Sequence, residues 1–534
     1  GELSENTTWT AANSPYIVTG DVTIAQYVTL TIEPGVIVRF AADSDDQSSG
    51  YDYYRSELRI EDGGALVAEG TATDSIKFMS NAEVPDEHDW YGISVTGYAS
   101  VDIRMSYVSF SNARYGFSSN SAGTGMYFYG DDGDTLSITN SYFRNIGEYV
   151  FYCRLYIQNG RALIKNNKFY NWNYSVFPGR VYLDHDALFH LDSNQFLHGE
   201  DLYFGNGNIA PGYWYIEDDS SRIWITNNTT DSHCQFYFRS WYEQSVRDYE
   251  IVVEGNNFKG NGADLIKFDG SSAIYGKFLF KDNVVDSAYV QFTYANKALI
   301  QGNTIKNCTD SYVTGLSISS SIAVVENNTI TGHRGNGLYL NLYTGYEDYV
   351  TDTVRNNIIT GNNNGNSYSR AGIVVGGYGD SYVIWENDIY DNAEMNGDPF
   401  NDLRVETSYL EGDLDARFNY WGTYTTAQMN QGGNPKDIDR IYDYYENDGY
   451  NRVNYANWLS EAGGDPPSSY TELGSILLTD ADGVEQLNFP VGSTLYVRVT
   501  DADRNADSGT AETVTATVTS DAETTGETVT LTET

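Results

Sequence analysis

The sequence predicts an all-β protein, in which a right-handed parallel β-helix of about 14–15 coils precedes a small immunoglobulin-like β-sandwich. Three observations support this fold class. An Asn residue recurs at coil-like intervals, short alternating strand patterns lie between the Asn residues, and the composition changes after a Gly- and Pro-rich segment near residue 465.

The recurring Asn stands two residues before a residue that is apolar in all members but one. The intervals between successive members run from 20 to 34 residues, as expected for a solenoid. Because Asn tolerates the left-handed conformation and bonds nearby backbone, we predict one corner per coil and a ladder of stacked side chains. The predicted ladder consists of Asn140, Asn167, Asn194, Asn228, Asn256, Asn283, Asn303, Asn328, Asn357, Asn387 and Asn419.

Short runs between these Asn residues have the alternating pattern of strands. Examples are 162–165, 251–254 and 298–301, each about four residues long. Helical periodicity is nearly absent over the same span. Parallel strands without crossover helices predict coils that stack at the strand separation of roughly 4.8 Å.

The predicted order of domains follows these patterns. Residues 1–21 form an N-terminal cap or strand, and 22–457 form the β-helix. Within it, 426–447 has helical potential and is expected to be a helical cap. The segment 458–469 is a linker, and 470–534 is the immunoglobulin-like module.

The last 65 residues are Thr-rich and lack the Asn pattern. Four strands are predicted there, at 475–478, 494–499, 513–518 and 528–531. A complete module of this kind needs about 100 residues. Two alternatives follow: the module is truncated, or a strand from another subunit completes it.

Three stretches carry a resemblance to a known family. They are 28–40, the Asn series, and Asn419-Tyr-Trp-Gly422 followed by 437–445. Through them the chain resembles right-handed parallel β-helix repeat proteins of microbial cell surfaces, and 470–534 resembles modules repeated in giant bacterial surface proteins. The resemblance implies a fold and no particular activity, because this scaffold hosts lyases, hydrolases, epimerases, adhesins and passive surface proteins.

The charge balance excludes several partners. The net charge of -43, from 31 basic and 74 acidic residues, argues against nucleic acid and against anionic membrane surfaces. No run of 18 apolar residues exists, so no membrane insertion is expected. An acidic surface suits an extracellular or cell-surface location. No signal peptide precedes Gly1, so we expect that it was removed.

One acidic motif has the spacing of a calcium loop. Oxygen ligands occur at positions 1, 3, 5, 7 and 12, although Ala506 replaces the usual turn glycine. The predicted ligands are Asp501, Asp503, Asn505, Asp507 and Glu512. The alternative is a solvated hairpin loop. Calcium is therefore the one cofactor predicted, and no organic cofactor is expected.

A second cluster suggests catalysis. His185, Asp186 and His190 lie close in sequence, and Arg161 and Lys165 lie roughly one coil earlier. A polysaccharide lyase needs a cation to neutralise a uronate carboxylate and a base to take the α-proton. The alternative is that these are polar residues on an outward face.

The main functional hypothesis is therefore an extracellular, non-catalytic surface protein that serves adhesion, coating or fibre assembly by strand complementation. Its expected partners are other copies of itself, cell surfaces or glycans. The alternatives are a polysaccharide lyase or glycoside hydrolase, and a non-catalytic glycan-binding protein that uses its 46 Tyr residues.

Overall fold

The computed structural model describes the chain except for residues 97–98, 120–124, 130–133, 178–179, 198–208, 210–212, 219, 241–249, 271–275, 344–351, 366–369, 379–381, 393, 396–397, 400, 411, 434, 465–474, 480–493, 501–512, 521–522 and 533–534. It divides into two compact units, Gly1–Gly464 and Asp465–Thr534. The boundary falls inside the segment predicted to be a linker.

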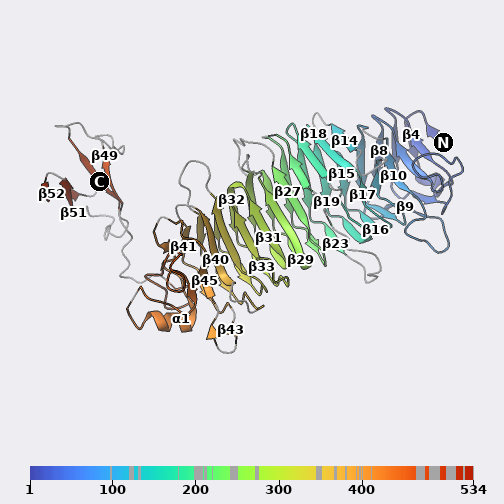
Figure 1. Ribbon diagram of the computed structural model, residues 1–534. Helices are drawn as coiled ribbons and strands as arrows, with labels where there is room; N and C mark the ends of the chain where they lie inside the picture. The colour runs from blue at the N-terminus through green and yellow to red at the C-terminus, as the bar shows by residue number, and fades with distance from the viewer. Residues whose placement is uncertain are drawn as a thin grey trace. The chain divides into compact units, whose positions relative to one another are not determined.

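The first unit is a right-handed parallel β-helix, whose strands stack coil upon coil (Figure 1). Sheet B runs through the whole stack, from β2 (Thr7–Trp9) through β5 (Thr29–Ile32), β8 (Ala65–Glu69), β11 (Asp102–Ser106), β15 (Asp134–Thr139), β19 (Arg161–Lys165), β22 (Leu188–Asp192), β25 (Arg222–Thr226), β28 (Ile251–Glu254), β30 (Gly276–Lys281), β32 (Ala295–Gln301), β35 (Ala323–Glu326), β38 (Asp352–Arg355), β41 (Tyr382–Trp385) and β46 (Leu414–Asp415) to β48 (Val453–Asn454). Fourteen of these strands lie between Val22 and Trp421, in agreement with the predicted number of coils.

Sheet C lies beyond the corner that follows sheet B and consists of two stacks. The first stack contains β3 (Tyr16–Val18), β6 (Ile37–Phe40), β9 (Ile76–Ser80), β12 (Val108–Ser111), β16 (Tyr142–Ile146), β20 (Lys168–Trp172), β23 (Gln195–Leu197), β26 (Thr229–Thr230), β29 (Asn257–Asp269), β31 (Val284–Thr293), β33 (Thr304–Lys306), β36 (Thr329–Thr331), β39 (Ile358–Thr360) and β42 (Asp388–Tyr390). The second contains β14 (Gly125–Tyr129), β18 (Arg154–Gln158), β21 (Arg180–Asp184), β24 (Tyr213–Ile216), β27 (Phe236–Ser240), β34 (Leu316–Ser319), β37 (Leu338–Tyr343), β40 (Ala371–Tyr378), β45 (Asn401–Val405) and β47 (Ile441–Tyr442). The long strands β29 and β31 belong to both stacks.

Sheet A closes the N-terminal coils. It contains β1 (Glu2–Leu3), β4 (Val22–Ile24), β7 (Glu57–Ile60), β10 (Gly92–Val95), β13 (Phe117–Ser118) and β17 (Phe151–Tyr152). A short antiparallel pair, β43 (Glu394–Met395) with β44 (Asp398–Pro399), is the one irregular addition among the described strands of this unit.

Alternation along each strand builds the core. In β19, Ala162 and Ile164 are buried while the residues between them face outward. The residue two positions after each corner also points inward, and Phe143, Phe169 and Phe196 stack there with ring centroids 5.4 and 5.1 Å apart. Each such buried ring stabilises the fold by roughly 1.5–3 kcal/mol.

Both ends of the β-helix are covered. At the N-terminus β1, β2 and β3 form a first coil, with a short 3₁₀ turn at Ala11–Asn13. At the C-terminus the helix α1 spans Gly422–Met429. The predicted helix over 426–447 is wrong in its extent, because Gly432 and Gly433 adopt left-handed conformations and Ile441 continues the stack in β47.

Part of the predicted linker packs on the β-helix. Leu459 is buried and its N–H donates to the Asn419 carbonyl at 3.0 Å. Gly463 N–H donates to Asp388 Oδ1 at 3.0 Å. The chain therefore leaves the β-helix after these contacts, later than the sequence suggested.

The second unit contains two antiparallel pairs among its described residues. β49 (Ser475–Thr479) pairs with β50 (Tyr496–Thr500), and β51 (Thr513–Ser520) pairs with β52 (Glu523–Thr532). These are the four strands predicted there, while the immunoglobulin-like sandwich remains a prediction. No helix among the described residues is long and apolar enough to cross a membrane.

Candidate functional site

The corner between sheets B and C carries a continuous ladder of Asn side chains. Each member donates its backbone N–H and its Nδ2 to Oδ1 of the next member, at distances such as 2.9 and 3.0 Å for Asn167 to Asn194. The Nδ2 also donates to a backbone carbonyl of the preceding coil. The members are Asn167, Asn194, Asn228, Asn256, Asn283, Asn303, Asn328, Asn357, Asn387 and Asn419.

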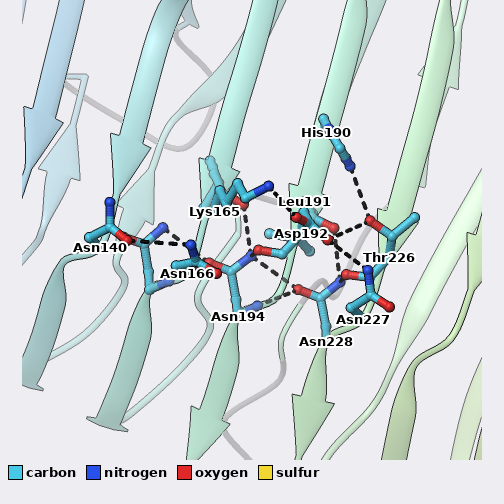
Figure 2. Close-up of polar contacts among 12 residues, drawn as sticks. Asn140, Lys165, Asn166, His190, Leu191, Asp192, Asn194, Thr226, Asn227 and Asn228 are labelled. Carbon is cyan, nitrogen blue, oxygen red and sulfur yellow. Dashed lines mark hydrogen bonds and ion pairs between the residues drawn. The ribbon is translucent and has the colours of Figure 1, made fainter.

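The prediction that Asn140 belongs to the ladder is wrong. Ser141 occupies its rung and donates its N–H to Asn167 Oδ1 at 2.9 Å. Asn140 is the left-handed residue just before the rung, with φ 50°, and accepts from Asn166 Nδ2 at 3.3 Å (Figure 2). We predicted that one Asn both adopts the left-handed turn and bonds to the next coil. In the structure the left-handed residue comes first, and the residue after it forms the bonds of the ladder.

A second, shorter ladder follows five residues later in the C-terminal coils. Cys308 N–H donates to His333 Nδ1, and His333 N–H donates to Asn362 Oδ1. Asn362 bonds Asn392 in the same way, and Asn392 donates twice to Asp402 Oδ1. The spacing of five from Asn328, Asn357 and Asn387 was visible in the sequence, but the mixed residue types concealed it.

The outer face of sheet B presents one row of mostly apolar side chains in register. The row, called here the apolar row, consists of Leu163, His190, Trp224, Val252, Leu279, Leu299, Val324, Thr353 and Val383. All are partly or well exposed, and Trp224 is 39% exposed. An outward row over nine successive coils, with an apolar residue on seven of them, is a surface suited to contact.

Charged residues flank the apolar row on both sides. Seven are basic: Arg161, Lys165, Arg222, Lys277, Lys281, Lys297 and Arg355. Four are acidic: Asp192, Glu250, Glu254 and Glu326. The whole chain has 31 basic and 74 acidic residues, so this face reverses the overall balance.

At one end of the apolar row, four polar groups are joined across three coils (Figure 2). Lys165 Nζ lies 2.9 Å from Asp192 Oδ2, and the Thr226 hydroxyl donates to Asp192 Oδ1 at 2.8 Å. His190 Nε2 lies 3.0 Å from the same hydroxyl. Since Thr226 gives its proton to Asp192, His190 must donate to Thr226.

The charges of this group are balanced by the ion pair between Lys165 and Asp192. Burial is the largest influence on Asp192 and raises its pKa, but hydrogen bonds from Asn227, Lys165 and Thr226 outweigh it and bring the pKa to about 2. Burial lowers the pKa of His190, and Lys165 lowers it further against the attraction of Asp192. At neutral pH the carboxylate is therefore ionised and occupied, and the imidazole is neutral.

The five predicted catalytic residues are only partly brought together. Arg161, Lys165 and His190 share the outer face of sheet B. His185 and Asp186 occupy the corner before β22 in left-handed conformations, and both are exposed. The Asp186 N–H donates to Asp218 Oδ2 and to the Ser220 hydroxyl on the next coil. His185 and Asp186 therefore belong to the corner and lie outside the outer face of sheet B.

A row of Tyr rings lies on the outer face of the second stack of sheet C. Centroids of Tyr127, Tyr156, Tyr182 and Tyr215 are 4.5, 4.7 and 5.1 Å apart, with interplanar angles of 6 to 11°. Because each ring face covers the next, the row offers edges and hydroxyls to solvent. Stacking of sugars on these faces would be confined to the ends of the row.

The calcium ligands predicted at Asp501, Asp503, Asn505, Asp507 and Glu512 lie outside the described residues. Elsewhere, Asp86, Glu87 and His88 place one ligand atom each within 4.8 Å of one another, a group that sequence reasoning missed. In the acidic segment 43–46, the Asp45 carboxylate accepts hydrogen bonds from the backbone N–H groups of Gln47 and Ser49, as in an ordinary turn.

One family comparison agrees with the fold of the N-terminal coils. Residues 1–129 match a family described as a pectate-lyase like beta helix domain, and 245–416 match a protein family of unknown function, DUF1565. The chain is a parallel β-helix protein. No curated protein matches it. It is similar to the crystal structure of a mutant of the periplasmic alginate epimerase AlgG, with 10% identity, a TM-score of 0.32, and coverage of 76% of this chain and 84% of that chain.

Proposed function

We propose that this protein is an extracellular, non-catalytic β-helix that binds an extended acidic polysaccharide along the outer face of sheet B. One observation carries the proposal: an apolar row, one residue per coil, with basic side chains on both sides. Pyranose rings present apolar C–H faces to such a row, and Arg and Lys pair with uronate carboxylates. Successive coils repeat at roughly 4.8 Å, close to the repeat of an extended (1→4)-linked chain.

The group around Asp192 supports binding without turnover at this face. A base must be free to accept the substrate's proton. Asp192 is ionised and holds three donors, while His190 commits its Nε2–H to Thr226. Lys165 is held in its ion pair with Asp192. This supports adhesion to a glycan over its cleavage.

The test compares two double variants by calorimetric titration with sodium polygalacturonate. Lys277→Ala with Lys297→Ala removes two flanking cations on adjacent coils. Lys168→Ala with Lys259→Ala is the matched control, because both lysines are exposed on the first stack of sheet C. We expect roughly tenfold weaker binding for the first pair, since each exposed ion pair contributes up to about 1 kcal/mol.

Two results would contradict the proposal. Equal affinity of both double variants would remove sheet B as the binding face. Release of unsaturated or shortened oligosaccharides by the wild-type protein would show turnover and favour the lyase or hydrolase alternative.

Fibre assembly is a second candidate, favoured by the second unit. An isolated two-stranded hairpin is marginally stable, and the described strands there form only two such pairs. We propose that a strand from another subunit completes the module and that calcium binds at 501–512. Electron microscopy of the purified protein with calcium and with chelator tests both ideas: polymers that need calcium support them, and dispersed monomers in both conditions contradict them.

A further inference from the structure

The outer face of sheet A carries a polar row that the chain itself covers. Thr23, Arg59, Ser94, Ser118 and Tyr152 are in register, one per coil. Ser94 and Ser118 are fully buried although they face away from the core of the β-helix. Outward hydroxyls become buried only when another part of the chain lies over them. Tyr51 of the segment 45–52 lies against Arg59 and reaches Val95, beside Ser94, whereas Tyr91 interacts with Ser118.

The segment 45–52 is attached to two buried carboxyl groups at the edge of sheet A. Tyr51 N–H donates to Glu57 Oε1 at 2.7 Å, and the Ser49 hydroxyl donates to Asp21 Oδ2 at 2.5 Å. The Tyr51 hydroxyl reaches the Val95 carbonyl at 3.1 Å. Gly50 lies so close that a Cβ there would be 1.7 Å from Glu57 Oε1.

The other oxygen of Glu57, Oε2, has no partner of ordinary hydrogen-bond geometry among the described residues. The Ser94 hydroxyl is the side-chain group that interacts with this carboxyl. That hydroxyl and the Tyr51 N–H can donate to an ionised Glu57, but burial of the charge outweighs both bonds. The contact between segment and sheet therefore suits the neutral carboxylic acid.

We propose that the segment 45–52 is an acid-locked cover, held on sheet A by protonated Glu57 and released when Glu57 ionises, so that the polar row is uncovered. Arg59 and Ser94 would then offer guanidinium and hydroxyl groups to solvent. This cover is distinct from the sheet B face and does not depend on the function proposed there.

The groups that face Glu57 set the pH range. Burial is the largest influence and raises the pKa of Glu57 from 4.5 to about 7; Asp21 also raises it, while Ser94, Tyr51 N–H and Arg59 lower it. Burial likewise raises the pKa of Asp21. Tyr91, the remaining ionisable group that interacts with Glu57, has its own pKa raised by burial and stays neutral in this range.

The sign of the effect follows from linkage. The closed form binds the proton of Glu57 more tightly than the open form, in which Glu57 has its ordinary pKa. Closure is therefore complete below pH 4.5, and opening grows by roughly tenfold per pH unit until about pH 7, where it levels off.

Hydrogen exchange of the full chain, corrected for intrinsic rates, measures this opening in residues 45–52. In wild type we expect exchange to rise by roughly 100-fold between pH 4.5 and 7. Glu57→Gln keeps the acceptor for Tyr51 without ionising, so the rise should shrink to the part due to Asp21. Glu83→Gln, at an exposed position, is the matched control and should behave as wild type.

A further variant disrupts the attachment of the segment 45–52 without changing the charge of Glu57. Gly50→Ala adds a Cβ that collides with Glu57 and strains a residue at φ +70°, so the segment should exchange rapidly at every pH. Exchange in wild type that shows no rise with pH, or a rise of the same size in Glu57→Gln, would overturn the proposal.

Discussion

The two corner ladders of the β-helix differ in the groups at their ends. The first ladder, from Asn167 to Asn419, consists of neutral amides, and each Oδ1 accepts two bonds from the rung before. The second ladder is short and contains two ionisable rungs, His333 next to Cys308 at its beginning and Asp402 at its end. The comparison teaches that stacked amides keep a corner insensitive to pH, whereas charged residues in the same geometry couple it to protons.

The end of the second ladder should be the most sensitive point. Asp402 is fully buried, and Arg440 Nη1 lies 3.6 Å from its Oδ2. Arg440→Met leaves that carboxylate without its partner, so we expect a loss of about 4 kcal/mol in unfolding free energy at pH 8. Chemical denaturation measures it, with Arg452→Met, an exposed arginine, as control. A smaller loss at pH 5 should follow, because Asp402 can then be protonated.

The middle of the first ladder should come next. Asn283→Ala leaves the backbone N–H of Asn256 without its acceptor and removes one acceptor of its Nδ2, which still donates to the Ile225 and Glu254 carbonyls. One unsatisfied buried donor, together with the lost bonds of Asn283 itself, should cost about 3 kcal/mol at any pH. Asn257→Ala, the exposed neighbour, should cost much less in the same denaturation experiment. Equal losses would mean that the ladder contributes little.

The pH profile distinguishes the two ladders directly. Burial raises the pKa of Asp402 to about 7, against the opposing effect of Arg440. Its contribution to stability is complete below pH 3.8 and is lost as the pH rises towards 7, by about 4 kcal/mol in total. Asp402→Asn should flatten this part of the profile. A variant that keeps the wild-type slope would assign the effect to another group.

The smallest change in stability is expected at His333, near the beginning of the second ladder. Burial lowers the pKa of His333 to about 4, so its imidazole is neutral at pH 7. The folded protein loses stability through this group only as the pH falls from 6.5 towards 4. His333→Asn should restore the amide pattern and change stability by less than about 1 kcal/mol at pH 7. Thermal melting at pH 7 and pH 4.5 measures both values, and the variant should lose the decline at acid pH.

The fold was predictable because its corners repeat. Asn spacing and alternating runs predicted the coils, their strands and the lack of helices between those strands. The error at Asn140 arose because Asn suits both the left-handed turn and the rung, so spacing alone could not separate neighbours. The C-terminal helix was misplaced because pairing of Ile441 with the stack outweighs local periodicity.

The candidate site was less accessible to prediction. Lys165 lies one coil before His190 and acts on its charge, whereas His185 occupies a left-handed corner outside sheet B. The apolar row was concealed because runs such as Ala323-Val-Val-Glu326 are apolar on both faces of the strand. The contacts of the segment 45–52 depend on tertiary packing of a loop, which local patterns do not encode.

The interval from Asn283 to Asn303 has a separate consequence. Its 20 residues complete one coil and keep both ladder bonds, so a turn of this helix requires no more chain than that. A designer could therefore duplicate this minimal unit to lengthen the protein, or shorten a bulky corner towards it, and leave the sheets undisturbed.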